Sequence, residues 1–483
     1  MHAHGTQRRA LLKAGAATGL AVLVPGCGPK SEPDTPAQAP PTGNTGPFTG
    51  GALRVDLVHS FDGTNETMTQ TNLRYEGAWS GPTSGLVEEL GWGDYRVSVY
   101  DANTQEVVFR SGFDSTVSAE SEEIESRLSV RFPMPSRECK AVIERRRTRM
   151  TFQRLWEYSI APSLAEIDRT PVKLPTLVDV LVENGPPAAK VDLTILAEGY
   201  REIEYGKFLA DAKRTLSYIF AVEPFKGRWS DFNVRSIFVV STDSGVIDRS
   251  QGVQKNTALR CAYEHGASER TLAPTDLRLV SEAASTAPSD LVLVLANTRR
   301  FGGSACFGGP AVVAIDSAFA PYLILHELGH AFAGLAEEYY RPMPDGAKYT
   351  GNIEPWYPNV TTSDEYPKWA HLAADPNVPA GKWNKAEYDA YFAVYLRRYV
   401  ALRDSAASED AMEKFMLEAS RRQASLLAKN QPLRRVAAFE GANAYAQGMY
   451  RAEVDCIMFS LQSSYFCGAC SAAIERMINY HTG

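Results

Sequence analysis

The sequence feature that most limits how this chain can fold is the segment His326-Glu327-Leu-Gly-His330, which lies in an otherwise apolar run. On a helix, residues four apart share one face, so both imidazoles could bind one ion while Glu327 points toward a water bound to it. Zinc lowers the pKa of such a water to about 7, and a nearby carboxylate can take its proton. The segment therefore predicts a helix in the wall of a catalytic zinc site, with Glu327 as general base.

A catalytic zinc usually has a third protein ligand, and the sequence offers several candidates. The residue six places after His330 is Ala336, so the histidine of the ordinary metzincin pattern is missing. Gly334 stands one place later than in that pattern, as if one residue were inserted, and this shift favours Glu337. The candidates, in order of preference, are Glu337, then Glu338, then Glu354 or His371.

The first 26 residues have the composition of an export signal, with Arg8-Arg9 ahead of an apolar, small-residue run. The residues around this pair resemble a twin-arginine signal, which is an address and not an anchor. Cys27 follows a sequence like a lipoprotein cleavage site, so residues 27–50 are predicted to be a lipidated cysteine and a flexible tether. We expect a cell-envelope lipoprotein held at a membrane by its acyl chains, with simple secretion as the alternative.

Beyond Cys27 the chain has six further cysteines, an even number that suits disulfides in an oxidising compartment. They are Cys139, Cys261, Cys306, Cys456, Cys467 and Cys470. Cys467-Gly-Ala-Cys470 also fits redox chemistry or half of a zinc knuckle, but the chain has no second such pair. We therefore expect structural disulfides, whose pairing the sequence does not determine.

Residue patterning after the tether predicts a mixed α+β and α/β protein of more than one domain. Residues 51–170 alternate short β-type runs with turn residues, which is typical of a β-sandwich. The expected strands of this part are residues 53–61, 95–100, 107–109, 128–132 and 150–156. Residues 171–483 form the predicted catalytic domain, where apolar strands at 191–196, 233–240 and 291–296 alternate with helical patterns such as 208–220.

A charged stretch at residues 386–430 carries aromatic residues at helical spacing. We interpret it as a helical insertion at the surface and not as a binding site. The net charge of −7, with no basic block, argues against a nucleic-acid partner. The sequence carries no signal for an oligomeric state.

The chain resembles the IgA-peptidase family of bacterial zinc metallopeptidases, the sixty-fourth metallopeptidase family, over nearly all of its length after the tether. The segments that carry the resemblance are Tyr75–Gly81, Gly112–Asp114, Leu196–Tyr200, Glu223–Phe225, Phe232–Val234, Asp243–Val246, Asn297, Phe301–Gly303, His326–Tyr339, Glu354–Pro355, Pro358–Thr361, Phe439–Ala442, Gly448–Arg451, Cys456–Met458, Phe466–Cys467 and Cys470. Single segments are weak signals, and their order and number make the match specific. The family usually has Asp-Glu-Tyr where this chain has Glu337-Glu338-Tyr339.

The resemblance implies a zinc endopeptidase with a metzincin-like layout following the β-sandwich. It implies that Met458 lies in a turn beneath the metal and that Asn297–Gly303 lies near the substrate edge of the sheet. Tyr450 is a candidate donor to the oxyanion of the transition state, with a packed tyrosine as the alternative. Specificity resides in clefts and loops, so the family name does not identify the substrate, which we expect to be a protein or glycoprotein.

Two functions of different class follow from the sequence. In the first, a zinc-activated water hydrolyses peptide bonds with Glu327 as general base. In the second, the chain is a non-catalytic surface lipoprotein whose β-domain binds protein or glycan. The intact set of His326, Glu327 and His330 favours the first, because a scaffold has no need of all three.

Overall fold

The computed structural model describes residues 46–115, 125–149, 151–263, 270–343, 346–351, 353–374 and 380–483. The predicted export signal, Cys27 and most of the predicted tether lie outside the described residues. Of the helices within these ranges, none combines the length and the apolar character that crossing a membrane requires.

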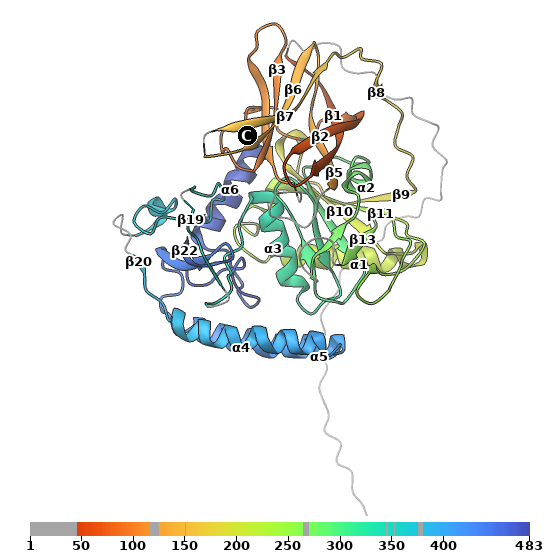
Figure 1. The fold of residues 1–483 in the computed structure, drawn as a ribbon. Coiled ribbons are helices and arrows are strands. Elements are labelled where there is room, and N and C mark those ends of the chain that lie inside the picture. The colour runs from red at the N-terminus through yellow and green to blue at the C-terminus, as the bar shows by residue number, and fades with distance from the viewer. Residues whose placement is uncertain are drawn as a thin grey trace, which may run out of the picture. The chain divides into compact units, whose positions relative to one another are not determined.

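Residues 48–168 form two four-stranded sheets that enclose one apolar core, as in a β-sandwich (Figure 1). One sheet has the order β5-β1-β2-β8 and the other β4-β3-β6-β7. The strands are β1 (Phe48–Phe61), β2 (Glu66–Ala78), β3 (Tyr95–Asp101), β4 (Val107–Phe113), β5 (Glu125–Pro135), β6 (Cys139–Arg146), β7 (Phe152–Ile160) and β8 (Ile167–Asp168). In β1, Leu53, Val55 and Leu57 alternate into this core. Arg54 and Asp56 form a buried ion pair, 2.7 Å between Nε and Oδ1.

The remaining residues are organised around a six-stranded sheet of order β16-β17-β15-β10-β11-β9. Its strands are β9 (Thr176–Val182), β10 (Val191–Glu198), β11 (Phe232–Val239), β15 (Leu291–Ala296), β16 (Gly303–Ser304) and β17 (Ala311–Ala314). The four inner strands run parallel and the two edge strands antiparallel. Nearly all inner-strand residues are buried, as expected for parallel strands covered on both faces. The mixed α/β prediction is therefore confirmed for this part.

Helix α3 (Ala320–Ala333) carries the His-Glu-Leu-Gly-His segment and packs on strand β17. Pro321 lies in its first turn, where the missing backbone N–H costs no hydrogen bond. Gly334 ends the helix in the left-handed conformation, with φ of 56°. Side chains on all sides of α3 are buried, because the helix lies between the sheet, helix α1 (Tyr205–Ile219) and helix α6 (Gly468–Thr482).

The C-terminal residues contribute a small sheet and a long loop, and the loop packs against α3 through Met458. Strands β18 (Ala347–Lys348), β19 (Val360–Thr361), β20 (Ala380–Gly381), β21 (Ala438–Ala442) and β22 (Tyr445–Arg451) form the small sheet. A further small sheet contains β12 (Ile247–Asp248), β13 (Cys261–Tyr263) and β14 (Leu272–Pro274), followed by helix α2 (Leu277–Ala284). The loop between β22 and α6 joins the segment after α3, because the Glu338 N–H donates to the Met458 carbonyl at 2.9 Å.

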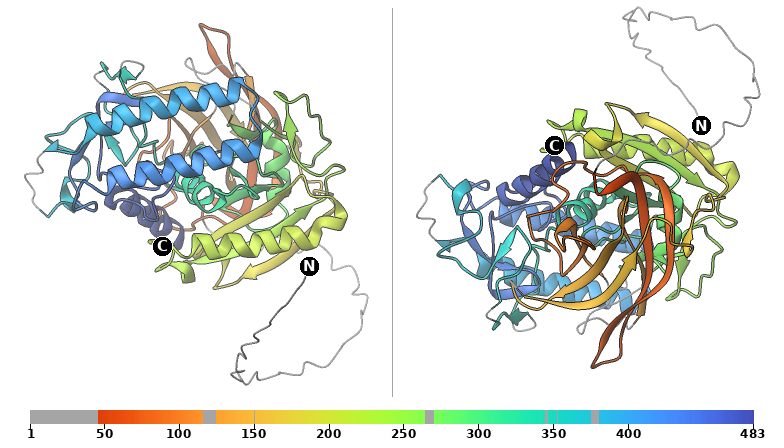
Figure 2. Two further views of the ribbon diagram at one scale, coloured as in Figure 1. Left: turned by 90° about the horizontal axis from the view of Figure 1, so that it is seen from below. Right: turned by 90° about the horizontal axis from the view of Figure 1, so that it is seen from above.

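The predicted helical insertion is present as two helices, α4 (Lys385–Asp404) and α5 (Glu409–Leu427), which lie side by side (Figures 1 and 2). Tyr395 of α4 and Phe415 of α5 stack with ring centroids 5.3 Å apart. Ser408 begins α5 by accepting a hydrogen bond from the Ala411 N–H. Residues 386–430 are thus largely helical, as their patterning predicted.

The structure contradicts the prediction of disulfides, because the five buried cysteines, Cys139, Cys261, Cys456, Cys467 and Cys470, are free thiols. Cys139 belongs to the core of the sandwich, whereas Cys261 belongs to the core around the six-stranded sheet. Neither of these two thiols forms a disulfide with another described cysteine. The other three buried thiols, of Cys456, Cys467 and Cys470, gather around one point together with a carboxylate.

Candidate metal centre

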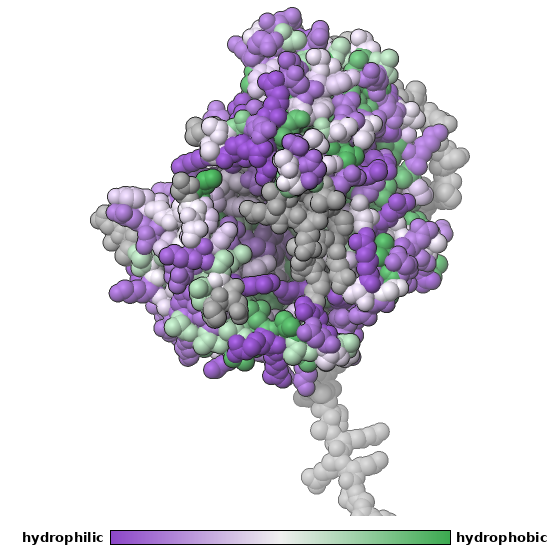
Figure 3. All heavy atoms as spheres, viewed as in Figure 1, coloured by the Kyte–Doolittle hydropathy of each residue, from purple (hydrophilic) through white to green (hydrophobic). Residues whose placement is uncertain are grey.

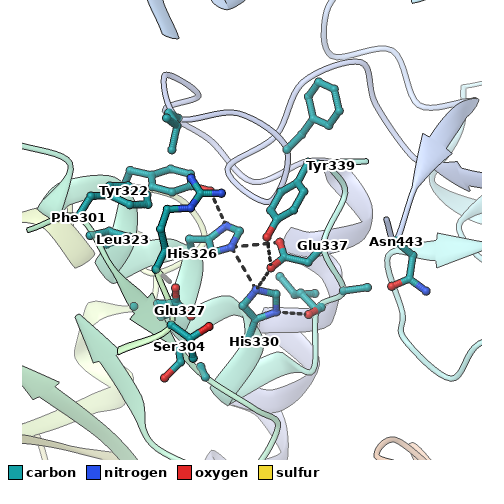
Figure 4. Close-up of a pocket in the computed structure, with 18 of the residues that line it drawn as sticks. Phe301, Ser304, Tyr322, Leu323, His326, Glu327, His330, Glu337, Tyr339 and Asn443 are labelled. Carbon is teal, nitrogen blue, oxygen red and sulfur yellow. Dashed lines mark hydrogen bonds and ion pairs between the residues drawn. The ribbon is translucent and has the colours of Figure 1, made fainter. Parts of the chain in front are cut away.

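Two imidazoles and one carboxylate converge beside helix α3 (Figure 4). The Nε2 atoms of His326 and His330 are 3.1 Å apart. The carboxylate of Glu337 lies 3.2 Å from Nε2 of His326 and 3.3 Å from Nε2 of His330. A tetrahedral ion with ligand bonds of about 2.0–2.1 Å separates its ligand atoms by about 3.3 Å. These spacings therefore fit one shared ion.

The chain reverses direction after α3, which brings Glu337 to the histidines. Gly334 closes the helix, and the Leu335 N–H donates to the Gly329 carbonyl at 3.2 Å. A Cβ at Gly334 would lie 2.7 Å from the ring of Trp356, so the turn requires glycine for both its φ and its space. The next residues then return along α3, and Glu337 reaches the open side of both rings.

The second ring nitrogens fix the orientation of both imidazoles. Nδ1 of His330 lies 2.6 Å from the Leu335 carbonyl, and Nδ1 of His326 lies 3.2 Å from the Ile457 carbonyl. Since a carbonyl oxygen only accepts, each Nδ1 carries a proton, and a ring without a second proton directs its Nε2 lone pair at the other two groups. Three such acceptors within 3.3 Å repel one another unless positive charge lies between them.

The electrostatics of the three groups show the same need for positive charge. Burial opposes the charged form of His330, but the neighbouring Glu337 carboxylate raises the pKa of this imidazole to about 9. Burial also opposes ionisation of Glu337, yet the two histidines hold its pKa well below the ordinary value. Among the described residues, no hydrogen bond reaches Oε2 of Glu337. The donor set therefore fits a divalent cation, and zinc is the ordinary ion for two histidines and a carboxylate.

Glu327 belongs to the same helix but faces a different direction. It lies near Ser304, away from Glu337 (Figure 4). The side chain is buried, and burial raises the pKa of its carboxyl above the ordinary value. A Cβ at Gly303 would lie 2.7 Å from Oε1 of Glu327, so glycine at this position leaves the room that the carboxylate occupies. Glu327 is thus placed beside the three converging groups without being one of them.

With Glu327 in its predicted role as general base, Gly303→Ala is expected to lower kcat by about 10–100-fold, because a base displaced by about 1 Å loses much of its effect. The metal content should not change, since Gly303 contacts Glu327 and none of the three converging groups. Steady-state kinetics on a peptide, together with metal analysis, would measure both quantities. The matched control is Gly206→Ala, where an added Cβ meets nothing within 4 Å. An unchanged kcat in Gly303→Ala would contradict the placement of Glu327.

Two tyrosines at the centre were not singled out in the sequence. The Tyr339 hydroxyl donates to Oε1 of Glu337 at 2.7 Å, and the Tyr322 hydroxyl lies 3.0 Å from Nδ1 of His326 (Figure 4). Tyr322 precedes His326 by four residues on α3, so helical spacing alone could have indicated it. The carbonyl of Ile457 had no such signal, because it lies 131 residues from its partner.

Other predicted site residues lie away from the three converging groups. Glu338 directs its carboxylate at Cys467 and Cys470. Glu354 binds Lys368 at 3.1 Å, and Tyr450 lies on β22, opposite Thr361 of β19. His371 and Tyr450 do not line the cleft described below.

The resemblance implied that Met458 lies beneath the metal and Asn297 near the substrate edge of the sheet, and the structure gives the surroundings of both residues. Met458 is fully buried against α3, where a Cβ at Gly329 would lie 2.9 Å from its Sδ. The Asn297 side chain donates to the Gly199 carbonyl at 2.9 Å and does not line the cleft. Gly303 does line the cleft, but its N–H donates to the Arg270 carbonyl at 3.2 Å.

A cleft of about 690 Å³ contains the three converging groups and Glu327. Helices α4 and α5 supply part of its wall, including Tyr391, Tyr395 and Met416. Residues 386–430 were interpreted as a surface insertion, and the structure adds that the inner face of these helices lines the cleft. On the face shown in Figure 3, hydrophilic side chains predominate and apolar ones gather over α4 and α5.

Comparison with known protein families gives two matches. A family model described as IgA Peptidase M64 matches residues 180–478, and one described as Peptidase M64 N-terminus matches residues 45–157. The first match contains the three converging groups, Glu327 and the α4–α5 hairpin. A search among curated proteins found no match.

Proposed function

Because this chain belongs to the IgA peptidase M64 family, whose members are metallopeptidases, we propose that it is a zinc endopeptidase. The proposed metal ligands are His326, His330 and Glu337, and the proposed general base is Glu327. The observation that supports this most directly is the convergence of two Nε2 atoms and one carboxylate within 3.3 Å.

Zinc bound by these groups would supply a Lewis acid that acidifies water and polarises the scissile carbonyl. The Glu327 carboxylate accepts a proton from the attacking water and later delivers it to the leaving amine. Its raised pKa, caused by burial, brings it closer to the pH at which a group can both accept and return a proton. The carbonyls of Leu335 and Ile457 keep the two rings oriented during this cycle.

The proposed substrate is a protein or glycoprotein chain. The cleft of about 690 Å³ is large enough for several side chains, and aromatic groups of α4 give it apolar surface. Tyr391 and Tyr395 are well placed to contact an apolar substrate residue. We further propose export and lipid anchoring at Cys27, on the sequence of residues 1–27 alone, and mass spectrometry of the mature N-terminus tests that part.

The alternative, a non-catalytic surface protein that binds protein or glycan through its sandwich, predicts no hydrolysis. Purified full-length protein should cleave casein or a mixed protein digest, and a chelator should remove essentially all of this activity. Restoring zinc should recover it, because the ligands are contributed by the folded chain. Protein that stays folded and zinc-loaded yet cleaves nothing in a broad panel would favour the binding function.

A further inference from the structure

A second cluster of metal-binding side chains lies behind the first. The thiols of Cys456, Cys467 and Cys470 and the carboxylate of Glu338 meet with all four ligand atoms within 4.8 Å of one another. All four of these residues are fully buried. None of them belongs to the proposed catalytic centre.

The spacing within the cluster suits tetrahedral coordination. The Sγ atoms of Cys456 and Cys470 are 3.8 Å apart. Oε1 of Glu338 lies 3.4 Å from Sγ of Cys467 and 3.2 Å from Sγ of Cys470. With zinc bonds of about 2.3 Å to sulfur and about 2.0–2.2 Å to oxygen, tetrahedral geometry gives about 3.8 Å between sulfurs and about 3.5 Å between sulfur and oxygen.

The surroundings stabilise negative charge on the sulfur atoms. Cys467 is the N-cap of α6 and Cys470 lies in its first turn, where the helix dipole favours anions. The N–H groups of Cys467 and Met458 point at Sγ of Cys456, at 3.2 and 3.5 Å. The buried Arg451 adds a positive charge that interacts with Glu338. The helix end and the two N–H groups therefore favour thiolates, and Arg451 favours the ionised form of Glu338.

One carboxylate oxygen of the cluster has no hydrogen-bond partner among the described residues. Among the residues that the structure describes, Oε2 of Glu338 has no hydrogen-bond partner although the side chain is fully buried. Burying such an oxygen without a partner is energetically unfavourable. A cation at the centre of the cluster would compensate it.

We propose that Glu338, Cys456, Cys467 and Cys470 bind a second divalent cation of the zinc class, with a structural role. Four protein ligands with none left for water are typical of structural zinc sites, and thiolates select zinc over calcium or magnesium. A disulfide between Cys456 and Cys470 explains fewer of these observations, because the thiol of Cys467 and the unpaired oxygen of Glu338 would still be buried.

The position of the cluster links it to the proposed catalytic centre. Glu338 is the neighbour of Glu337, and Cys456 is the neighbour of Ile457, whose carbonyl accepts from His326. The Glu338 N–H also donates to the Met458 carbonyl at 2.9 Å. A cation in the cluster would therefore hold together the two chain segments that place the third ligand and orient the first.

The test is the metal content of full-length protein purified under reducing, oxygen-free conditions. We expect two zinc ions per chain, one for each ligand group. The His326→Ala/His330→Ala variant should keep one, and the Cys467→Ser/Cys470→Ser variant should lose the one that the histidine variant keeps. Cys139→Ser, which changes a buried thiol of the sandwich, is the matched control and should keep both.

Cobalt substitution identifies the ligands without relying on a variant that folds. Cobalt in the wild-type chain should show thiolate-to-metal charge-transfer absorption, and the histidine variant should retain it. A single ion per chain without sulfur ligands, or a disulfide among the three cysteines in protein from its native compartment, would overturn the proposal. Because these readouts require no hydrolysis, they are independent of whether the chain cleaves proteins.

Discussion

Glu327→Gln is expected to lower kcat by about 10²–10⁴-fold, the usual contribution of a general base. The amide has the size of the carboxylate but cannot accept the proton of the attacking water. Zinc content should stay at the wild-type level, because Glu327 is not one of the three converging groups. The measurement is kcat for a fluorogenic peptide alongside zinc analysis of the same sample.

Glu354→Gln is the matched control for this substitution, since the Glu354 carboxylate binds Lys368 and Thr362 away from the cleft. Its kcat should equal that of the wild type. A Glu327→Gln enzyme with wild-type kcat would exclude Glu327 as the base. Loss of zinc in the same variant would instead show that Glu327 helps to bind the ion.

Glu337→Gln is expected to weaken binding of the catalytic zinc by more than about 100-fold. Substitutions of residues that only orient ligands already cost about 10–100-fold, and a ligand contributes more. Activity should fall with the metal and return in part at high zinc. Competition with a chelator of known affinity would give the dissociation constant.

Glu338→Gln distinguishes the two neighbouring carboxylates. It removes none of the three catalytic ligands, because the Glu338 side chain faces Cys467 and Cys470. If Glu338→Gln removed the histidine-bound zinc and Glu337→Gln did not, the assignment of the third ligand would be reversed.

Sequence patterning predicted the elements with strong hydrophobic periodicity and failed where that signal is weak. The buried strands β10, β11 and β15 and helix α1 were all expected within a few residues. Strand β2 was not expected, because only Met68 and Leu73 of its residues are buried and most of the others are polar. Strand β6 was missed since its apolar centre is short and charged residues flank it.

The part of the candidate site that lies on one helix was predictable from residue spacing. His326, Glu327 and His330 lie on one helix, so their positions follow from the sequence. The choice between Glu337 and Glu338 depended on how the chain turns after the helix, which a one-residue shift in spacing could only suggest. The even number of cysteines favoured disulfides, but the number alone does not show which thiols lie close together in the fold.

Glu337 and Glu338 are joined by one peptide bond yet serve two different clusters. One of these clusters is completed only by residues 456–470, which the ribosome adds more than a hundred residues after the histidines. We therefore expect a growing polypeptide to hold both rings and still lack a rigid third ligand. Such a protease would be latent throughout its synthesis, which protects the machinery that makes it.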